Sequence, residues 1–195
     1  MSDASNQPVV FVVDDDPAVR EAVSSLLRST GLRVAEFDSA RSFLDADADA
    51  DAGRPEPSCL VLDVRMPGMT GLDLQRELVR RNVATPIVFI TGHGDIPMAV
   101  SAMKLGAVEF LPKPFREHDL LDAVWAAIRR HERHTEERVV IAAIRQRYDT
   151  LTDREREVLG PIVEGRLNKQ VGAALGVSEQ TVKVHRHNIM RKMGV

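Results

Sequence analysis

The chain has almost no cysteine. Among its 195 residues only Cys59 carries a thiol, which excludes a disulfide within the chain and is typical of proteins from a reducing cytoplasm. Cys59 lies inside an apolar run, CLVL, so we expect a small buried hydrophobic side chain there rather than a nucleophile.

Long apolar runs are missing as well. No segment approaches the roughly 18 uncharged apolar residues that a transmembrane helix requires. Residues 1–9 have neither the basic start nor the apolar centre of a signal peptide. We therefore expect a cytoplasmic protein that has no membrane partner.

Acidic residues disappear near the end of the chain. Residues 150–195 contain eight Lys and Arg residues against five Asp and Glu residues, although the whole chain has a formal net charge of −3. No acid follows Glu179. This asymmetry predicts an acidic domain followed by a domain that meets a polyanion.

What the sequence does contain is a regular alternation of strand and helix patterns. Five short apolar runs predict strands, and a segment with helical spacing of its apolar residues follows each of them. The strand candidates are residues 9–13, 32–37, 59–62, 87–90 and 109–111. Parallel strands require helical crossovers, so we expect an α/β fold with a five-stranded, doubly wound parallel sheet.

The rest of the chain is predicted to be helical. Residues 129–149 form a helical linker that could pair with another helix, although its apolar stripe is too short to predict a coiled coil. Three short helices separated by glycine-containing turns are expected at residues 152–164, 168–175 and 179–193. They are typical of a small all-α helix-turn-helix domain, so the chain is expected to divide into domains at 1–128 and 150–195.

Reactive side chains stand at the ends of four predicted strands. They are Asp14 and Asp15 after the first strand, Asp63 after the third, Thr91 after the fourth and Lys113 after the fifth. The carboxyl ends of parallel strands share one edge of the sheet, where open α/β sheets bind their ligands. Taken alone, Asp63 could equally be a helix cap or a turn residue.

Together these groups predict a site of phosphoryl transfer. Clustered carboxylates repel one another unless a cation or a shared proton relieves the repulsion. Oxygen ligands favour Mg²⁺, which keeps several waters and readily takes a phosphate oxygen as a further ligand. A lysine and a threonine hydroxyl suit the remaining phosphoryl oxygens, so we expect a carboxylate that receives a phosphoryl group.

A second acidic pattern lies at residues 45–56. DADADADAG places acids at alternating positions with Glu56 beyond it, as in a calcium-binding loop. However, Ala50 stands where such a loop needs glycine, and Pro55 and Pro57 crowd its end. A solvated surface loop is the preferred interpretation.

The last predicted helix has two faces of different chemistry. Val182, Ile189 and Met193 share a face that can pack inward. The opposite face carries Gln180, Lys183, Val184, His187 and Arg191. A basic face can simply keep a protein soluble, but the preceding turn and short helix favour reading of the DNA major groove. Lys169, at a helix start, is better placed to bind a phosphate.

These motifs resemble a known family. DDD-P after the first strand, LDVRMPGMTG, FITGHGD and EFLPKPF are similar to the receiver domain of two-component response regulators. LTDREREVL, EGRLNKQV and SEQTVKVHRHNIMRKM are similar to a LuxR-type helix-turn-helix, and the order of all these motifs resembles the FixJ/NarL class. The resemblance implies a flavodoxin-like receiver and a transcription factor rather than an enzyme, with slow self-dephosphorylation only. Its implied partners are a sensor histidine kinase, double-stranded DNA and, on phosphorylation, a second copy of the chain.

The resemblance also implies a role for each matching residue of the phosphorylation pocket. Asp63 matches the phosphoacceptor, and Asp14 and Asp15 match the acidic pair that holds Mg²⁺, for which Mn²⁺ can substitute. The backbone carbonyl of Arg65 matches a further metal ligand. Lys113 matches the lysine that pairs with a phosphoryl oxygen, and we expect a cis peptide bond between it and Pro114.

Other matches concern the switch and the DNA-reading helix. Thr91 matches the switch hydroxyl, and Phe110 matches the aromatic residue that rotates with it. Lys183, Val184 and His187 match base-facing positions. By contrast, Asp16 is expected only to start a helix, and His93 to be a loop residue that tunes the lifetime of the phosphate.

Three features depart from the family pattern. Pro161 falls inside a predicted helix, which it should kink or pack atypically, and Gly172 should weaken its short helix by up to about 1 kcal/mol relative to alanine. The chain also ends at Val195, where the family continues into a fourth helix. Ile189 and Met193 are therefore expected to lack their usual cover.

Two other functions are alternatives to that of a DNA-binding response regulator. A phosphatase of the haloacid-dehalogenase type also uses a strand-end aspartate, but it needs a second acid where Arg65 stands. Alternatively, a receiver could act by protein contact alone if the small domain had lost DNA binding through changes such as Pro161 and Gly172.

Overall fold

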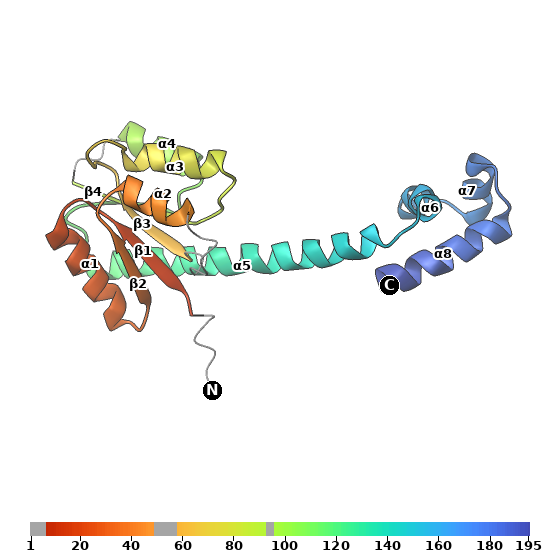
Figure 1. Cartoon of the computed structure of the whole chain (residues 1–195), viewed down its shortest axis with the longest axis horizontal. Coiled ribbons are helices and arrows are strands. Elements are labelled where there is room, and N and C mark those ends of the chain that lie inside the picture. The colour runs from red at the N-terminus through yellow and green to blue at the C-terminus, as the bar shows by residue number, and fades with distance from the viewer. Residues whose placement is uncertain (1–6, 49–57, 93–95) are drawn as a thin grey trace. The chain divides into compact units, whose positions relative to one another are not determined.

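The computed structural model describes residues 7–48, 58–92 and 96–195 (Figure 1). The chain divides into two compact units, Met1–His134 and Thr135–Val195. Within the described ranges, none of the helices combines the length and the apolar character needed to cross a bilayer. His93 and most of the acidic stretch at 45–56 lie outside these ranges.

A five-stranded parallel sheet forms the centre of the N-terminal unit, with the strand order β2-β1-β3-β4-β5. The strands are β1 (Val9–Val13), β2 (Arg33–Phe37), β3 (Cys59–Asp63), β4 (Ile87–Thr91) and β5 (Glu109–Pro112). β1, β3 and β4 are buried at every residue because helices cover both faces of the sheet. The predicted doubly wound α/β fold is confirmed.

Helices make the outer layers of this sheet (Figure 1). They are α1 (Pro17–Ser29), α2 (Ala40–Ala48), α3 (Gly71–Arg80), α4 (Ile96–Lys104) and α5 (Glu117–Asp149). Successive strand residues point to opposite faces, so Phe11 packs in a core with α2, α3 and α4, and Val12 packs in a core with α1 and α5. Cys59 is buried in the second core, where burial raises the pKa of its thiol.

α2 corrects the interpretation of the acidic stretch as a loop from Asp45 onward. The helix continues to Ala48, so the first residues of the DADADADAG run are helical. Alanine favours helix, and Asp45 forms an ion pair with Arg41 one turn earlier, with 2.9 Å between its Oδ1 and Nε of the arginine.

α5 is one continuous helix of 33 residues, and the predicted linker 129–149 lies within it. Its first part buries Leu120, Val124 and Ile128 against the sheet, whereas Trp125 on another face is partly exposed. Near the end of the helix, the guanidinium of Arg156 lies 5.3 Å from the ring centroid of Tyr148.

Three short helices with defined caps build the C-terminal unit. They are α6 (Asp153–Val163), α7 (Asn168–Leu175) and α8 (Glu179–Met193). Thr152 and Glu155 form the predicted capping box of α6, and Ser178 caps α8 by accepting from the backbone N–H of Thr181. Gly176 ends α7 with φ of 67°, a backbone conformation that favours glycine.

The expectation that Ile189 lacks cover is wrong. Ile189 is only 2% exposed and packs with Leu151, Val158 and Val171, which come from α6, α7 and the turn before α6. Met193 is half-buried against the same core. The packing of three helices supplies the cover, which the pattern along α8 alone does not reveal.

Gly172 has a packing function that helix propensity does not describe. A Cβ atom at this position would lie 2.7 Å from the carbonyl oxygen of Val177, closer than atoms can pack. Glycine therefore lets α7 approach the turn that leads into α8. α6 continues through Pro161 to Val163, so the missing N–H of the proline falls in its last turn.

Candidate functional site

The strand-end residues gather at the carboxyl edge of the sheet, as the sequence predicts. Asp14 directly follows β1, Asp63 is the last residue of β3, Thr91 is the last residue of β4 and Lys113 directly follows β5. The lysine backbone N–H donates to the carbonyl oxygen of Thr91 at 2.7 Å, which holds the end of β5 beside β4. The predicted cis peptide bond between Lys113 and Pro114 is confirmed.

One ammonium group joins the two buried acids. Nζ of Lys113 donates to Oδ2 of Asp14 at 2.7 Å and to Oδ1 of Asp63 at 2.8 Å, although these residues are 99 and 50 positions away in the chain. Both acids are almost fully buried, while the lysine side chain is partly exposed. The pocket therefore places two carboxylates and one cation in direct contact.

Local backbone turns hold the second oxygen of each acid. Oδ1 of Asp14 accepts from the backbone N–H of Asp16 at 2.9 Å, and Oδ2 of Asp63 accepts from that of Arg65 at 2.6 Å. Each carboxylate is thus fixed by one backbone donor and by Lys113, so its orientation is set before any ligand binds.

The pocket holds two carboxylates but one ammonium group, and the pKa values of Asp63 and Lys113 are shifted by burial and by this imbalance of charge. Burial raises the pKa of Asp63, the hydrogen bond and charge of Lys113 oppose this rise, and the nearby Asp14 adds to it. Burial lowers the pKa of Lys113, but hydrogen bonds to Asp14 and Asp63 outweigh burial, and the net shift is upward. One ammonium cannot neutralise two carboxylates, so the pocket keeps a negative charge.

The remaining predicted residues of the pocket differ in exposure. Thr91 is fully buried, and Phe110 is partly buried with its ring centroid 6.1 Å from that of Phe89. Asp15 is exposed next to Asp14. Asp16 caps α1, as expected, because its Oδ1 accepts from the backbone N–H of Ala18 at 2.8 Å.

Two residues of the pocket were not predicted from the sequence. Nη1 of Arg20 donates to the carbonyl oxygen of Asp14 at 2.6 Å, a contact that requires the first turn of α1 to lie over the end of β1. Gly71 opens α3 so close to Asp63 that any Cβ would collide with the carbonyl oxygen of the aspartate. The sequence signal for Gly71 is its place at the end of the LDVRMPGMTG motif.

The donor set at this edge fits a hard divalent cation that keeps part of its water shell. Oxygens of Asp14 and Asp63 both reach one atom of Lys113, so they are close enough to share a cation. Among residues 7–48, 58–92 and 96–195, no three His, Cys, Asp or Glu side chains form a metal-binding cluster. Water and backbone oxygens would have to complete the coordination, as is usual for Mg²⁺.

A second candidate site is the outer face of α8. The residues predicted for this face are all exposed: Gln180, Lys183, Val184, His187 and Arg191. Val182 and Ile189 on the inner face are buried, so the predicted division of the helix into two faces is confirmed. Lys169 is exposed as the second residue of α7.

Comparison with known families covers both units. Residues 10–125 match the response regulator receiver domain, and residues 149–195 match the luxR family of bacterial regulatory proteins. The chain belongs to the response regulators. As a response regulator it combines a receiver with a LuxR-type DNA-binding domain, and regulation of transcription is its function.

Matches to relatives of this response regulator extend over most of the length of both chains. The chain is 51% identical over 189 residues to the response regulator protein TmoT of Ectopseudomonas mendocina, covering 97% of this chain and 84% of TmoT. It is 45% identical over 184 residues to the transcriptional regulatory protein FixJ of Azorhizobium caulinodans, covering 94% and 85% of the two proteins. The solved structure of the response regulator StyR is similar with a TM-score of 0.80 at 50% identity, covering 97% of this chain and 93% of StyR.

Proposed function

We propose that Asp63 accepts a phosphoryl group from a histidine of a sensor histidine kinase, and that this modification controls DNA binding by the C-terminal unit. The contact of Lys113 with both Asp14 and Asp63 at the carboxyl edge of the sheet carries this proposal. Residues 1–128 receive the signal, residues 129–149 connect the domains and residues 150–195 bind DNA.

The chemistry is a direct displacement at phosphorus. An Asp63 carboxylate oxygen forms a new O–P bond while the P–N bond to the kinase histidine breaks. Lys113 then donates to a phosphoryl oxygen. It so stabilises the negative charge, which now lies on the phosphoryl group instead of the carboxylate. Water later hydrolyses the acyl phosphate slowly, which restores the free carboxylate of Asp63. This slow self-dephosphorylation does not make the protein an enzyme.

The charge balance of the pocket favours a divalent cation. Asp14, Asp15, Asp63 and the backbone carbonyl of Arg65 would hold Mg²⁺, or Mn²⁺ in its place. When bound, this ion neutralises the charge that develops on the phosphoryl oxygens. Lys113 cannot do so alone, because it already faces two carboxylates before the phosphoryl group arrives.

Phosphorylation changes a face made by α4 and β5. A phosphoryl oxygen draws the hydroxyl of Thr91 inward, and Phe110 fills the space that the hydroxyl leaves. This face exposes apolar side chains of α4, with Ile96 81% and Val100 45% exposed. The altered face pairs with the same face of a second copy, which brings two DNA-binding units together.

The outer face of α8 reads DNA in this dimer. Lys183 and His187 lie one turn apart and contact base edges, with Val184 beside them to contact a thymine methyl group. Gln180 and Arg191 extend the same face, and Lys169 binds a backbone phosphate.

Phosphate-affinity electrophoresis after incubation with acetyl phosphate tests the phosphoacceptor. We expect a retarded species that requires Mg²⁺ and disappears in Asp63→Asn, because the amide cannot form an acyl phosphate. Asp122→Asn, an exposed acid on α5, is the matched control and should keep the retarded species. Undiminished phosphorylation of Asp63→Asn would show that another residue is the acceptor.

A further inference from the structure

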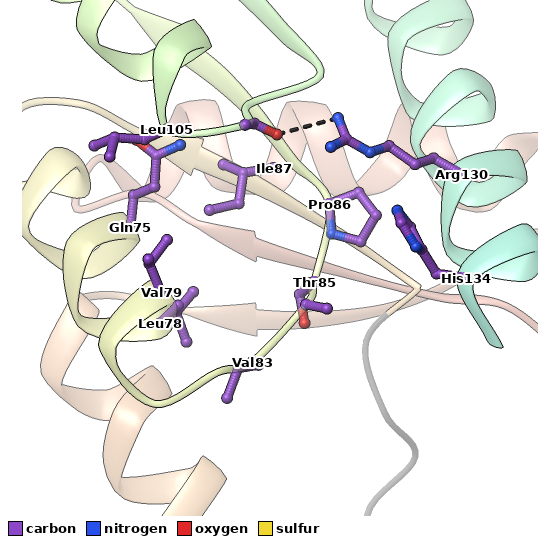
Figure 2. A pocket seen from close by; sticks show the side chains of 12 residues that line it. Gln75, Leu78, Val79, Val83, Thr85, Pro86, Ile87, Leu105, Arg130 and His134 are labelled. Carbon is purple, nitrogen blue, oxygen red and sulfur yellow. Dashed lines mark hydrogen bonds between the residues drawn. The ribbon is translucent and has the colours of Figure 1, made fainter. Parts of the chain in front are cut away.

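The first part of α5 is fixed to the receiver. Ile128 is buried against the sheet, and Nη1 of Arg130 donates to the carbonyl oxygen of Gly106 at 3.2 Å, the dashed line in Figure 2. From there α5 continues as one helix into the C-terminal unit and ends at Asp149. The orientation of α8 relative to α5 is therefore set at residues 150–152, the joint between α5 and α6.

Packing does not fix the last part of α5 at this joint. The residues of α5 within the C-terminal unit, 135–149, are all exposed. Leu151 in the joint is buried in the core that α6, α7 and α8 share, so this core holds the connection but not the helix. A helix that buries no side chain keeps one direction only if polar side chains bridge it to its neighbours.

Arg147, in the last turn of α5, makes one such bridge. Its Nη1 donates to the carbonyl oxygen of Met193 at 2.8 Å, across 46 positions of the chain. Met193 is the last residue of α8, so its carbonyl belongs to the group that lacks partners within the helix. The partial negative charge at the end of a helix suits a cation, and the contact therefore ties α5 to the end of α8.

Gly194 makes room for this bridge. A Cβ atom at this position would lie 2.9 Å from Nη1 of Arg147, too close for undisturbed packing. The φ of Gly194 is 74°, a backbone conformation that favours glycine at the end of a helix. The residue that ends α8 thus lets the guanidinium approach the helix terminus.

Arg156 makes a second bridge, in the opposite direction. From α6 its Nη2 donates to the carbonyl oxygen of Asp149, the last residue of α5, at 3.2 Å. Its guanidinium also lies 5.3 Å from the ring centroid of Tyr148. Two bridges that start from different helices oppose rotation of α5 about the joint, which a single contact could not do.

We propose that Arg147 and Arg156 fix the direction of α5 relative to α8 and thereby set the spacing of the two DNA half-sites that a dimer binds. This inference rests on the proposed dimer and on the proposed reading of DNA by α8. Two reading helices meet their half-sites together only when the protein holds them at the matching separation. Both arginines are positioning residues, because neither belongs to the outer face of α8.

Binding of the phosphorylated whole chain to two DNA duplexes tests this role. One duplex has the half-site spacing that the wild type selects, and the other has two extra base pairs between the half-sites. The wild type should bind the longer duplex about tenfold more weakly, and Arg147→Met only about twofold more weakly, because a loose joint lets α8 follow the displaced half-site. Arg145→Met, an exposed neighbour on α5, is the matched control and should behave as the wild type.

Two measurements separate positioning from folding. Arg147→Met should keep both the base preference within each half-site and the urea midpoint of the wild type, because the outer face of α8 and the core beneath it are unchanged. Residual dipolar couplings test the joint without DNA. In the wild type, the amides of residues 135–149 and of α6 to α8 should fit one alignment tensor, whereas the double variant Arg147→Met/Arg156→Met should need two.

The inference is overturned if Arg147→Met and the wild type lose the same affinity on the longer duplex. It is also overturned if residues 135–149 of the wild type need an alignment tensor of their own. A wild type without any base preference would instead refute the proposed reading of DNA by α8, and the dipolar couplings would still decide whether the two arginines hold α5.

Discussion

Lys192 and Glu155 form an ion pair that joins the last turn of α8 to the first turn of α6, with 2.6 Å between Nζ and Oε2. The same ammonium donates to the carbonyl oxygen of Thr150 at 3.0 Å, and the glutamate accepts from the backbone N–H of Thr152 at 2.8 Å. The pair therefore couples the cap of α6 to the position of the helix that we propose reads DNA.

Replacing Lys192 with methionine should destabilise the C-terminal unit by roughly 1–2 kcal/mol. The buried carboxylate of Glu155 then loses its cation, while the partial exposure of the lysine limits the loss. Hydrogen exchange of α6 and α8 amides measures the effect. Lys183→Met, on the exposed face of the same helix, should leave exchange unchanged, and equal effects of the two variants would contradict the importance of the pair.

Lys192→Met should also change how the unfolding free energy of the C-terminal unit depends on pH. The hydrogen bond from Lys192, followed by that from the backbone of Thr152, holds the pKa of Glu155 below its usual range. A lowered carboxyl pKa contributes stability that is complete above the unfolded value and is lost as the pH falls through the folded value. The difference in unfolding free energy between wild type and Lys192→Met should therefore shrink below about pH 4. A constant difference from pH 3 to pH 7 would show that Lys192 acts by packing alone.

Gly172 and Gly160 provide a matched pair of helical glycines. Gly172→Ala should destabilise the C-terminal unit by about 1–3 kcal/mol, because the new methyl group collides with the carbonyl oxygen of Val177. Gly160→Ala meets no atom within 4 Å and should stabilise α6 by about 0.5–1 kcal/mol. Urea unfolding measures the free energy of unfolding of each variant. If both substitutions stabilised the unit, α7 would not need its close approach to the following turn.

Asp63→Asn should raise the thermal stability of the receiver. The pKa of Asp63 is raised mainly by burial, so the folded receiver binds a proton more readily than the unfolded chain does. The unfolding free energy of the wild type therefore falls as the pH rises from the pKa of Asp63 in the unfolded chain to its pKa in the folded receiver. The asparagine side chain does not titrate, so the variant does not lose this stability. Thermal unfolding at a series of pH values should show a difference between variant and wild type that grows with pH and then levels off.

Lys183 and Lys169 should have different effects on DNA binding. Lys183→Ala should cost roughly 1–3 kcal/mol and relax the preference at one base position, as expected for a lost base contact. Lys169→Ala should weaken binding to all sequences alike and reduce the salt slope by about one. Selection of DNA sequences with the phosphorylated form of each variant compares the two effects. An unchanged preference in Lys183→Ala at every position contradicts the proposed orientation of α8 in the groove.

Dimerisation through α4 and β5 should depend on Ile96. Light scattering of the beryllofluoride-treated protein should show a larger species at micromolar concentration, and Ile96→Lys should prevent it by placing a charge in the apolar contact. Val163→Lys changes an equally exposed valine of α6 and should have no effect. A monomer mass for the treated wild type would refute the proposed dimer.

The sheet and the edge that carries the acids could be predicted because they follow from patterns along the chain. VVFVV and CLVL are continuous apolar runs, and the parallel arrangement brings Asp14 and Asp63 to one edge whatever the loops do. The cover of Ile189, the close approach at Gly172 and the contact of Arg20 with Asp14 could not be predicted. Each depends on how one element lies against another, which single-helix periodicity and propensity do not encode.

Trp125 and Tyr148 divide the chain's chromophores between its two units. The sequence has one tryptophan and one tyrosine. The tryptophan belongs to the N-terminal unit, and the tyrosine, with the guanidinium of Arg156 over its ring, belongs to the C-terminal unit. Tryptophan fluorescence excited at the red edge of the absorption band, where tyrosine does not absorb, therefore reports on the receiver alone.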